Sequence, residues 1–354
     1  MSGFDYGNAR LRAMKSRLLS RSTLEELCQA GSVQGLITAL VDTAYREAVQ
    51  AELVRLTGME CLAAALRNDL VATLGNARRF FTGSEGELAA LVLRRYDVHN
   101  LKTVLRGLAR QAPANEILAG ILPIGDLRSP DLTELARTAD VRAAIDLIAT
   151  WRLPAAQPLL DLRAARPGAE LFDMEVVLDR WHFHRAFQGV GREDTVLSES
   201  LTLEADIANI MTALRLVGAP ESASILRDRF GADSVTALFV GPESVLFALL
   251  VQVARQELVP RAIELLAGTR YGPTLVSASE AYAASHRLSV FERALMQQRL
   301  LHAAGLIVRD PLGIGVLLGY VALKTNEVAN IRAITQGLML AEKPDRIQAE
   351  LMFA

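Results

Sequence analysis

The segment Asp97-Val98-His99-Asn100-Leu101 occurs three times in this chain of 354 residues, returning as Asp206-Ile207-Ala208-Asn209-Ile210 and as Glu327-Val328-Ala329-Asn330-Ile331. Each copy has an acidic residue, an aliphatic residue, any residue, an asparagine and a second aliphatic residue, without a gap. Apolar residues continue beyond each asparagine at helical spacing, which predicts three amphipathic helices. The chain has only eight asparagines, and three of them occupy this one position, so chance does not explain the pattern.

Two further elements precede each asparagine in the same order. The nearer one pairs a large apolar residue with a glutamate, as Met59-Glu60, Met174-Glu175 and Phe291-Glu292. The farther one has three aliphatic residues at identical spacing: Leu24, Leu27 and Val33; Leu132, Leu135 and Val141; Leu250, Val253 and Val259. Three elements in one order indicate three homologous units, which we call copy 1 (24–107), copy 2 (132–216) and copy 3 (250–337).

The composition of the chain and the positions of its proline and glycine residues indicate that the whole chain is helical and divided into three parts. Ala, Leu, Arg and Glu dominate, which favours helices over strands. Proline and glycine gather between the copies, and the period exceeds that of ankyrin or tetratricopeptide arrays. We therefore predict an all-α protein of three similar multihelical domains at 1–115, 116–228 and 229–354. Four helix starts have capping-box spacing: Thr23 with Glu26, Thr57 with Glu60, Asp131 with Glu134, and Ser289 with Glu292.

Bulk properties exclude several classes of protein. The formal net charge of -2 lacks the basic excess of a nucleic-acid-binding protein. No apolar run is long enough to span a bilayer, and the first residues do not have the pattern of a secretory signal. Cys28 and Cys61 lie far apart, as expected of buried thiols in a reducing compartment. We expect a cytoplasmic protein that does not cross the membrane.

Motifs for chemistry are missing. No Gly-Lys pair is present, so a P-loop is excluded and we expect no direct ATP binding. Gly313-x-Gly315 followed by Gly319 has one residue too many for a dinucleotide-binding turn. His182 and His184 would point to different faces of a helix, which disfavours a metal site. We expect no catalytic residues, no cofactor and no metal.

The repeated polar residues admit two interpretations. Glu60, Glu175 and Glu292 could form a carboxylate cluster for acid-base chemistry, but helix capping is favoured for the two that fit capping boxes. Asn100, Asn209 and Asn330 could contact a partner, but buried amides that fix one helix against its neighbour are favoured. The basic amphipathic stretch between Arg10 and Arg21 is typically a solvated face, and contact with headgroups or a partner is the alternative.

Charge is distributed unevenly among the copies. Residues 1–112, 113–228 and 229–354 have net charges of +4, -7 and +1. The acidic middle segment could select one orientation of an asymmetric partner. Its candidate partner-binding residues are Asp173, Asp179, Glu193, Asp194, Glu199 and Glu204.

Motifs spread along the whole chain resemble those of the C subunit of the V/A-type ATPases and ATP synthases, which is called the d subunit in eukaryotes. They are the segment from Tyr6 to Ala13, Arg95-Tyr96-Asp97-x2-Asn100-Leu101-Lys102, Met174-Glu175-x2-Leu178-Asp179-Arg180, and Lys324-x2-Glu327-Val328-x-Asn330-Ile331-Arg332-x-Ile334-x2-Gly337. Trp181-His182 stand where this family often has two tyrosines. The resemblance implies a pseudo-three-fold funnel of helices that carries no catalytic residues and binds neither cofactor nor metal.

The same resemblance implies a place in a rotary machine. Such a protein is peripheral and lies on the cytoplasmic face of the membrane. It joins the central shaft subunits of D/F type to the proteolipid rotor ring and transmits torque for proton or sodium transport. A helical scaffold or regulatory protein without a motor is the alternative.

Overall fold

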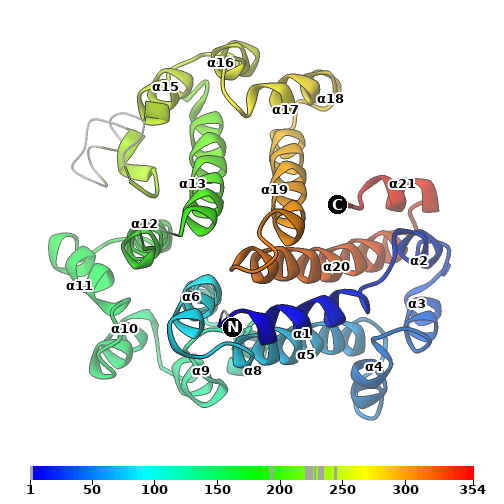
Figure 1. Cartoon of the computed structure of the whole chain (residues 1–354). Coiled ribbons are helices and arrows are strands. Elements are labelled where there is room, and N and C mark those ends of the chain that lie inside the picture. The colour runs from blue at the N-terminus through cyan, green and yellow to red at the C-terminus, as the bar shows by residue number, and fades with distance from the viewer. Residues whose placement is uncertain (1–2, 192–193, 220–225, 227–228, 230–234, 243–244) are drawn as a thin grey trace. The chain divides into compact units, whose positions relative to one another are not determined.

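A computed structural model describes residues 3–191, 194–219, 226, 229, 235–242 and 245–354. These residues form helices and no strand, which confirms the all-α prediction (Figure 1). The chain divides into two compact units. Unit 1 contains Met1–Asp97, Leu122–Arg128 and Leu300–Ala354, and unit 2 contains Val98–Ile121 and Ser129–Arg299.

Unit 1 joins the beginning of the chain to its end. Its helices are α1 (Asp5–Lys15), α2 (Arg21–Leu27), α3 (Val33–Leu40), α4 (Arg46–Leu53), α5 (Gly58–Arg79), α6 (Gly83–Leu93), α20 (Gly315–Met339) and α21 (Pro344–Ala349). The last long helix, α20, packs against α1, α2, α3 and α5. The asparagine helix of copy 3 therefore packs against the first helices of copy 1.

Unit 2 contains the helices between. They are α8 (Ala114–Ala119), α9 (Ser129–Ala136), α10 (Val141–Thr150), α11 (Ala156–Ala165), α12 (Leu171–Gly189), α13 (Thr195–Leu216), the 3-10 turn η1 (Val235–Leu238), α15 (Val245–Ala254), α16 (Val259–Leu266), α17 (Gly272–Ser277) and α18 (Ser279–Ser285). Two helices pass from one unit to the other: α7 (Arg95–Ala109) and α19 (Ser289–Arg309).

The sequence repeat corresponds to a repeat of helices. The aliphatic triads begin in α2, α9 and α15, and the first two residues of each triad are buried. The residues paired with Glu60, Glu175 and Glu292 lie at the start of α5, α12 and α19, and the three asparagines lie on α7, α13 and α20. The two units do not follow the predicted boundaries at 115 and 228, because unit 1 takes pieces from both ends of the chain. The division into three domains stays a prediction.

Helix starts differ from the predicted capping boxes. The cap of α2 is Ser20, whose hydroxyl accepts from the Thr23 N–H at 3.1 Å, so Thr23 lies inside the helix. Thr57 precedes α5 without a side-chain capping bond, and Gly58 there has φ +55°, which turns the chain as it enters the helix. Asp131 and Ser289 also lie within α9 and α19. Local spacing alone does not identify the cap where several hydroxyl or carboxyl groups precede one helix.

No helix in the described part of the chain is both long enough and apolar enough to cross a membrane.

Candidate functional site

Two of the repeated asparagines each hold the main chain of one residue outside their helix by a reciprocal pair of hydrogen bonds. Asn209 Nδ2 donates to the Val240 carbonyl at 2.9 Å, and the Val240 N–H donates to Asn209 Oδ1 at 2.8 Å. Asn330 does the same with Met352, at 2.8 and 3.0 Å. A carboxamide matches the donor and acceptor of a peptide group, so asparagine can satisfy a buried main chain from one side. Asn100 is also fully buried.

The acidic residue of two copies accepts a hydrogen bond from a buried tyrosine. The Tyr271 hydroxyl donates to Asp206 at 2.6 Å, and the Tyr45 hydroxyl donates to Glu327 at 2.7 Å. In each case the tyrosine belongs to the following copy, if copy 1 is taken to follow copy 3. Burial is the main cause that raises the pKa of both tyrosines and of Asp206, so the hydroxyls stay donors at neutral pH.

The two tyrosines share one local structure. Each follows a threonine by two residues, and the threonine hydroxyl donates to a main-chain carbonyl while accepting from the tyrosine N–H, in Thr43 and in Thr269. Copy 2 has Leu153 at the matching position, which has no hydroxyl. Asp97 accepts instead from the Asp126 and Leu127 N–H groups, at 2.8 and 3.0 Å, and burial raises its pKa.

Two of the repeated glutamates form ion pairs with the preceding copy. Arg106 Nε and Nη2 each donate to one oxygen of the Glu175 carboxylate at 2.6 Å, and Arg215 pairs with Glu292 at 3.1 Å. Each arginine stands six residues after the asparagine of its copy. The hydrogen bonds that Arg106 donates to the Glu175 carboxylate raise the pKa of Arg106. The Glu292 carboxylate thus reaches across to another helix, and its role as a helix cap stays a prediction.

Glu60 is exposed near the start of α5. The residue six places after Asn330 is the neutral Gln336, so copy 3 does not offer an arginine at that position. Glu60 therefore lies in unit 1, whereas Glu175 and Glu292 lie in unit 2, each paired with an arginine.

A buried ionic cluster lies in unit 1, around Lys324. Its Nζ lies 2.8 Å from Asp69 Oδ2, 2.8 Å from Glu327 Oε1 and 2.9 Å from the Tyr45 hydroxyl. The ammonium also lies 4.3 Å from the centre of the Tyr45 ring. Glu327 further accepts from the Leu19 N–H. Copies 3 and 1 are thereby joined through the buried Lys324 and Glu327 and the partly exposed Asp69.

The remaining acidic candidates mostly make contacts within unit 2. Asp173 is buried against Arg166 and caps α12 by accepting from the Glu170 N–H, so it is not a surface charge. Asp179 pairs with Lys102 at 2.7 Å, and Glu204 with Arg299 at 3.1 Å. Asp194 accepts from the Gly191 N–H. Glu199 is exposed, and Glu193 lies outside the described residues.

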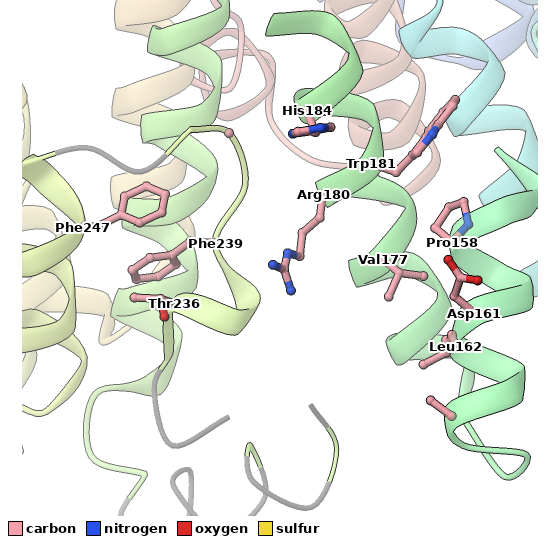
Figure 2. A pocket seen from close by; sticks show the side chains of 12 residues that line it. Pro158, Asp161, Leu162, Val177, Arg180, Trp181, His184, Thr236, Phe239 and Phe247 are labelled. Carbon is pink, nitrogen blue, oxygen red and sulfur yellow. The ribbon is translucent and has the colours of Figure 1, made fainter. Parts of the chain in front are cut away.

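An open pocket of unit 2 has a volume of about 700 Å³ and lies between α12 and the segment around η1. Figure 2 shows Arg180 pointing toward Thr236 and Phe239, and its Nη1 donates to the Ala237 carbonyl at 3.0 Å. His184 contacts Gln188 at 2.8 Å, while His182 packs against Phe183. Among the described residues, no group of three or more His, Cys, Asp or Glu is placed to hold a metal.

The glycine-rich turn before α20 is filled by the chain itself. The Gly315 N–H donates to Asp310 Oδ2 at 2.8 Å, and Asn8 Nδ2 donates to the Gly313 carbonyl at 3.0 Å. A side chain on Gly313 would collide with Asp310. These glycines therefore allow a tight approach of side chains rather than of a dinucleotide.

Sequence reasoning missed the partners of the repeated residues. Tyr45 and Tyr271 carried a usable signal, because Thr-x-Tyr recurs in copies 1 and 3. Arg106 and Arg215 also share their spacing from the asparagine. Nothing in the local sequence pointed to Asp69 as the partner of Lys324.

The chain is similar along nearly its whole length to known proteins. The family model described as ATP synthase (C/AC39) subunit matches residues 7–350. The C subunit of the A-type ATP synthase of Methanocaldococcus jannaschii is 26% identical over 99% of this chain and 87% of its own length. The corresponding protein of Halobacterium salinarum is 26% identical over 99% and 98%, and that of Methanosarcina acetivorans 26% over 95% and 89%.

Proposed function

Because the chain belongs to the ATP synthase (C/AC39) subunit family, we propose that it is a non-catalytic adaptor in the central stalk of a rotary V/A-type ATPase or ATP synthase. It would link the shaft subunits of D/F type to the membrane proteolipid ring, on the cytoplasmic face. It would transmit torque for proton or sodium transport.

The observation that supports this role most is the way successive copies are joined. Within unit 2, copy 1 pairs with copy 2 through Arg106 and Glu175, and copy 2 with copy 3 through Asp206 and Tyr271. Within unit 1, copy 3 pairs with copy 1 through Lys324 and Asp69. A succession in which the last copy returns to the first is what a pseudo-three-fold funnel around a shaft requires.

Contacts between successive copies would make the protein stiff enough to transmit torque. A part that passes torque must not yield at its internal joints, and close-packed helices with low compressibility suit that task. Ion pairs and the hydrogen bonds of the asparagine carboxamides add directional contacts that resist sliding of one helix along another. Asn209 and Asn330 would add to this stiffness by holding the main chain at Val240 and Met352, and none of the three repeated asparagines would contact a partner directly.

Exposed side chains would then make the contacts with the shaft. Of the acidic candidates described, Glu199 is exposed and Asp194 is partly exposed, whereas Asp173 is buried. We propose Glu199 and Asp194 as the residues of this set that would orient an asymmetric shaft.

Bridging is the test of the proposal. A purified shaft complex and a purified ring in detergent are mixed with and without the protein, and association is measured by size exclusion. We expect a joint complex only in its presence, with an interface of roughly 1,200–2,000 Å² for each specific contact. Association of shaft and ring to the same extent without the protein would contradict the adaptor role. Binding of the protein to neither component would favour the scaffold without a motor.

A further inference from the structure

Copies 1, 2 and 3 follow one another along the chain, whereas copy 3 and copy 1 are brought together by non-covalent contacts. Within unit 1 these contacts form a seam, by which we mean the packing of α20 against α2, α3 and α5. Helix α2 is the shortest of the helices at the seam, with seven residues. An isolated helix of that length is not stable in water, so the position of α2 depends on the groups around it.

Residues 351–353, which we call the latch segment, are bound by α20. Asn326 Nδ2 and Asn330 Nδ2 each donate to the Met352 carbonyl at 2.8 Å, and the Met352 N–H donates to Asn330 Oδ1 at 3.0 Å. The two asparagines stand one turn apart on the same face of the helix, so both reach the same carbonyl oxygen. Leu351 is buried as well. The latch segment forms neither helix nor strand, and the carboxamides of α20 satisfy the main chain of Met352 instead.

The latch segment also contacts α2, on the other side of the seam. The Arg21 guanidinium lies 4.9 Å from the centre of the Phe353 ring, and Arg21 Nε donates to Glu25 Oε1 at 2.7 Å. Hydrogen bonds from Arg21 and then from Gln348 of α21 lower the pKa of Glu25. Figure 1 shows α21 beside α2. Residues 348–353 therefore contact α20 and α2 at the same time.

Release of the latch segment requires less than unfolding of the unit. It breaks the three hydrogen bonds to Met352 and the contact between Phe353 and Arg21, and the first two of these residues are already partly exposed. The core residues of α5 and α20, in contrast, are buried along the length of both helices. A segment with few contacts opens locally at a smaller free energy than the core around it. Opening of the seam should therefore begin at the latch segment.

We propose that the latch segment, by binding α20 and α2 together, controls whether the seam is open or closed. While it is bound, its contact with Arg21 keeps α2 in place. When it leaves Asn326 and Asn330, α2 detaches while α5 and most of α20 stay folded. This goes beyond the proposed function, because it concerns how the succession of copies is closed and not what the chain binds. The test uses the isolated protein, so its failure leaves the bridging result standing.

Amide hydrogen exchange followed by mass spectrometry tests the proposal on the full chain and on a chain shortened to residues 1–350. We expect the amides of α2 to exchange at least about tenfold faster in the shortened chain, because three hydrogen bonds are lost and each changes an opening equilibrium about fivefold. Exchange in α5 and α13 should change by less than about twofold. In the full chain, urea below the unfolding transition should accelerate exchange in α5 more than in α2, since a local opening exposes little surface.

Point variants identify the contacts responsible. Phe353→Ala and Asn326→Ala each remove one contact of the latch segment and should accelerate exchange in α2 at least about threefold. Phe172→Ala is the control for the ring, because Phe172 also lies beside an arginine, Arg229, but in unit 2. Gln336→Ala is the control for the amide, because Gln336 is exposed on α20. Both controls should change exchange in α2 by less than about twofold.

Circular dichroism verifies that each variant is folded, and the two point variants decide the question if the shortened chain does not fold. Three results would overturn the proposal. They are unchanged exchange in α2 of the folded shortened chain, equal acceleration in α2, α5 and α13, and equal effects of the latch and control variants. The second of these would mean that residues 351–354 stabilise the whole protein rather than the seam.

Discussion

Removal of the Lys324 ammonium should destabilise unit 1 strongly. Lys324 is 6% exposed, and the substitution Lys324→Met keeps the length of the side chain while deleting its charge. Asp69 and Glu327 then lose their cation, and the Glu327 side chain, only 4% exposed, is left as a buried charge. Loss of one partner of a buried ion pair costs about 3–5 kcal/mol. We expect the lower end, because the Asp69 side chain is 20% exposed and can regain water.

Urea unfolding followed by circular dichroism measures the free energy, and amide hydrogen exchange of α20 and α5 locates the loss in unit 1. Lys343→Met is the matched control, because Lys343 is exposed, and it should change the free energy of unfolding by less than about 0.5 kcal/mol. Lys324→Met combined with Glu327→Gln should cost less than the sum of the single changes, with a coupling of about 1–3 kcal/mol. A loss below about 1 kcal/mol for Lys324→Met, or additive single changes, would refute a buried ionic joint between copies 3 and 1.

Two further predictions concern the other joints. Glu175→Gln should lower the free energy of unfolding by about 1–2 kcal/mol, because it weakens the ion pair with Arg106. The control Glu60→Gln changes an exposed residue and should lower it by less than about 0.5 kcal/mol. Equal losses in urea unfolding would argue against the ion pair. Tyr45 and Tyr271 have raised pKa values, so their stabilising protonated state is fully present below the unfolded pKa of about 10 and is lost as pH rises through the higher folded pKa. Absorbance titration at 295 nm should therefore show Tyr45 and Tyr271 ionising only together with alkaline unfolding; reversible ionisation of both hydroxyls in the folded protein near pH 10 would contradict this.

The sequence was sufficient for the fold class and for the order in which the repeated helices follow one another. Helical periodicity is a local property, and the repeat supplied three independent views of it. The order of aliphatic triad, glutamate and asparagine is found again in the helices from α2 to α7, from α9 to α13 and from α15 to α20.

The joints could not be predicted in the same way, because their partners are remote along the chain. Tyr45 and Glu327 are separated by 282 residues, and no spacing rule connects them. The acidic surface expected on copy 2 depended equally on remote partners: Lys102 neutralises Asp179 and Arg299 neutralises Glu204. Net charge along a segment describes a surface only where the opposite charges are not supplied by another segment.

The composition of unit 1 from both ends of the chain has a consequence for biosynthesis. A nascent chain emerges from the ribosome at about 5–20 residues per second, so the interval between Asp97 and Leu300 lasts on the order of 10–40 s. Unit 2 can fold as it emerges, because its segments lie between these two points. The first 97 residues, in contrast, must wait for α20 while the faces of α1, α3 and α5 that will receive it stay open to water or to a chaperone. Translation speed and chaperone supply therefore bear more on the yield of unit 1 than on that of unit 2.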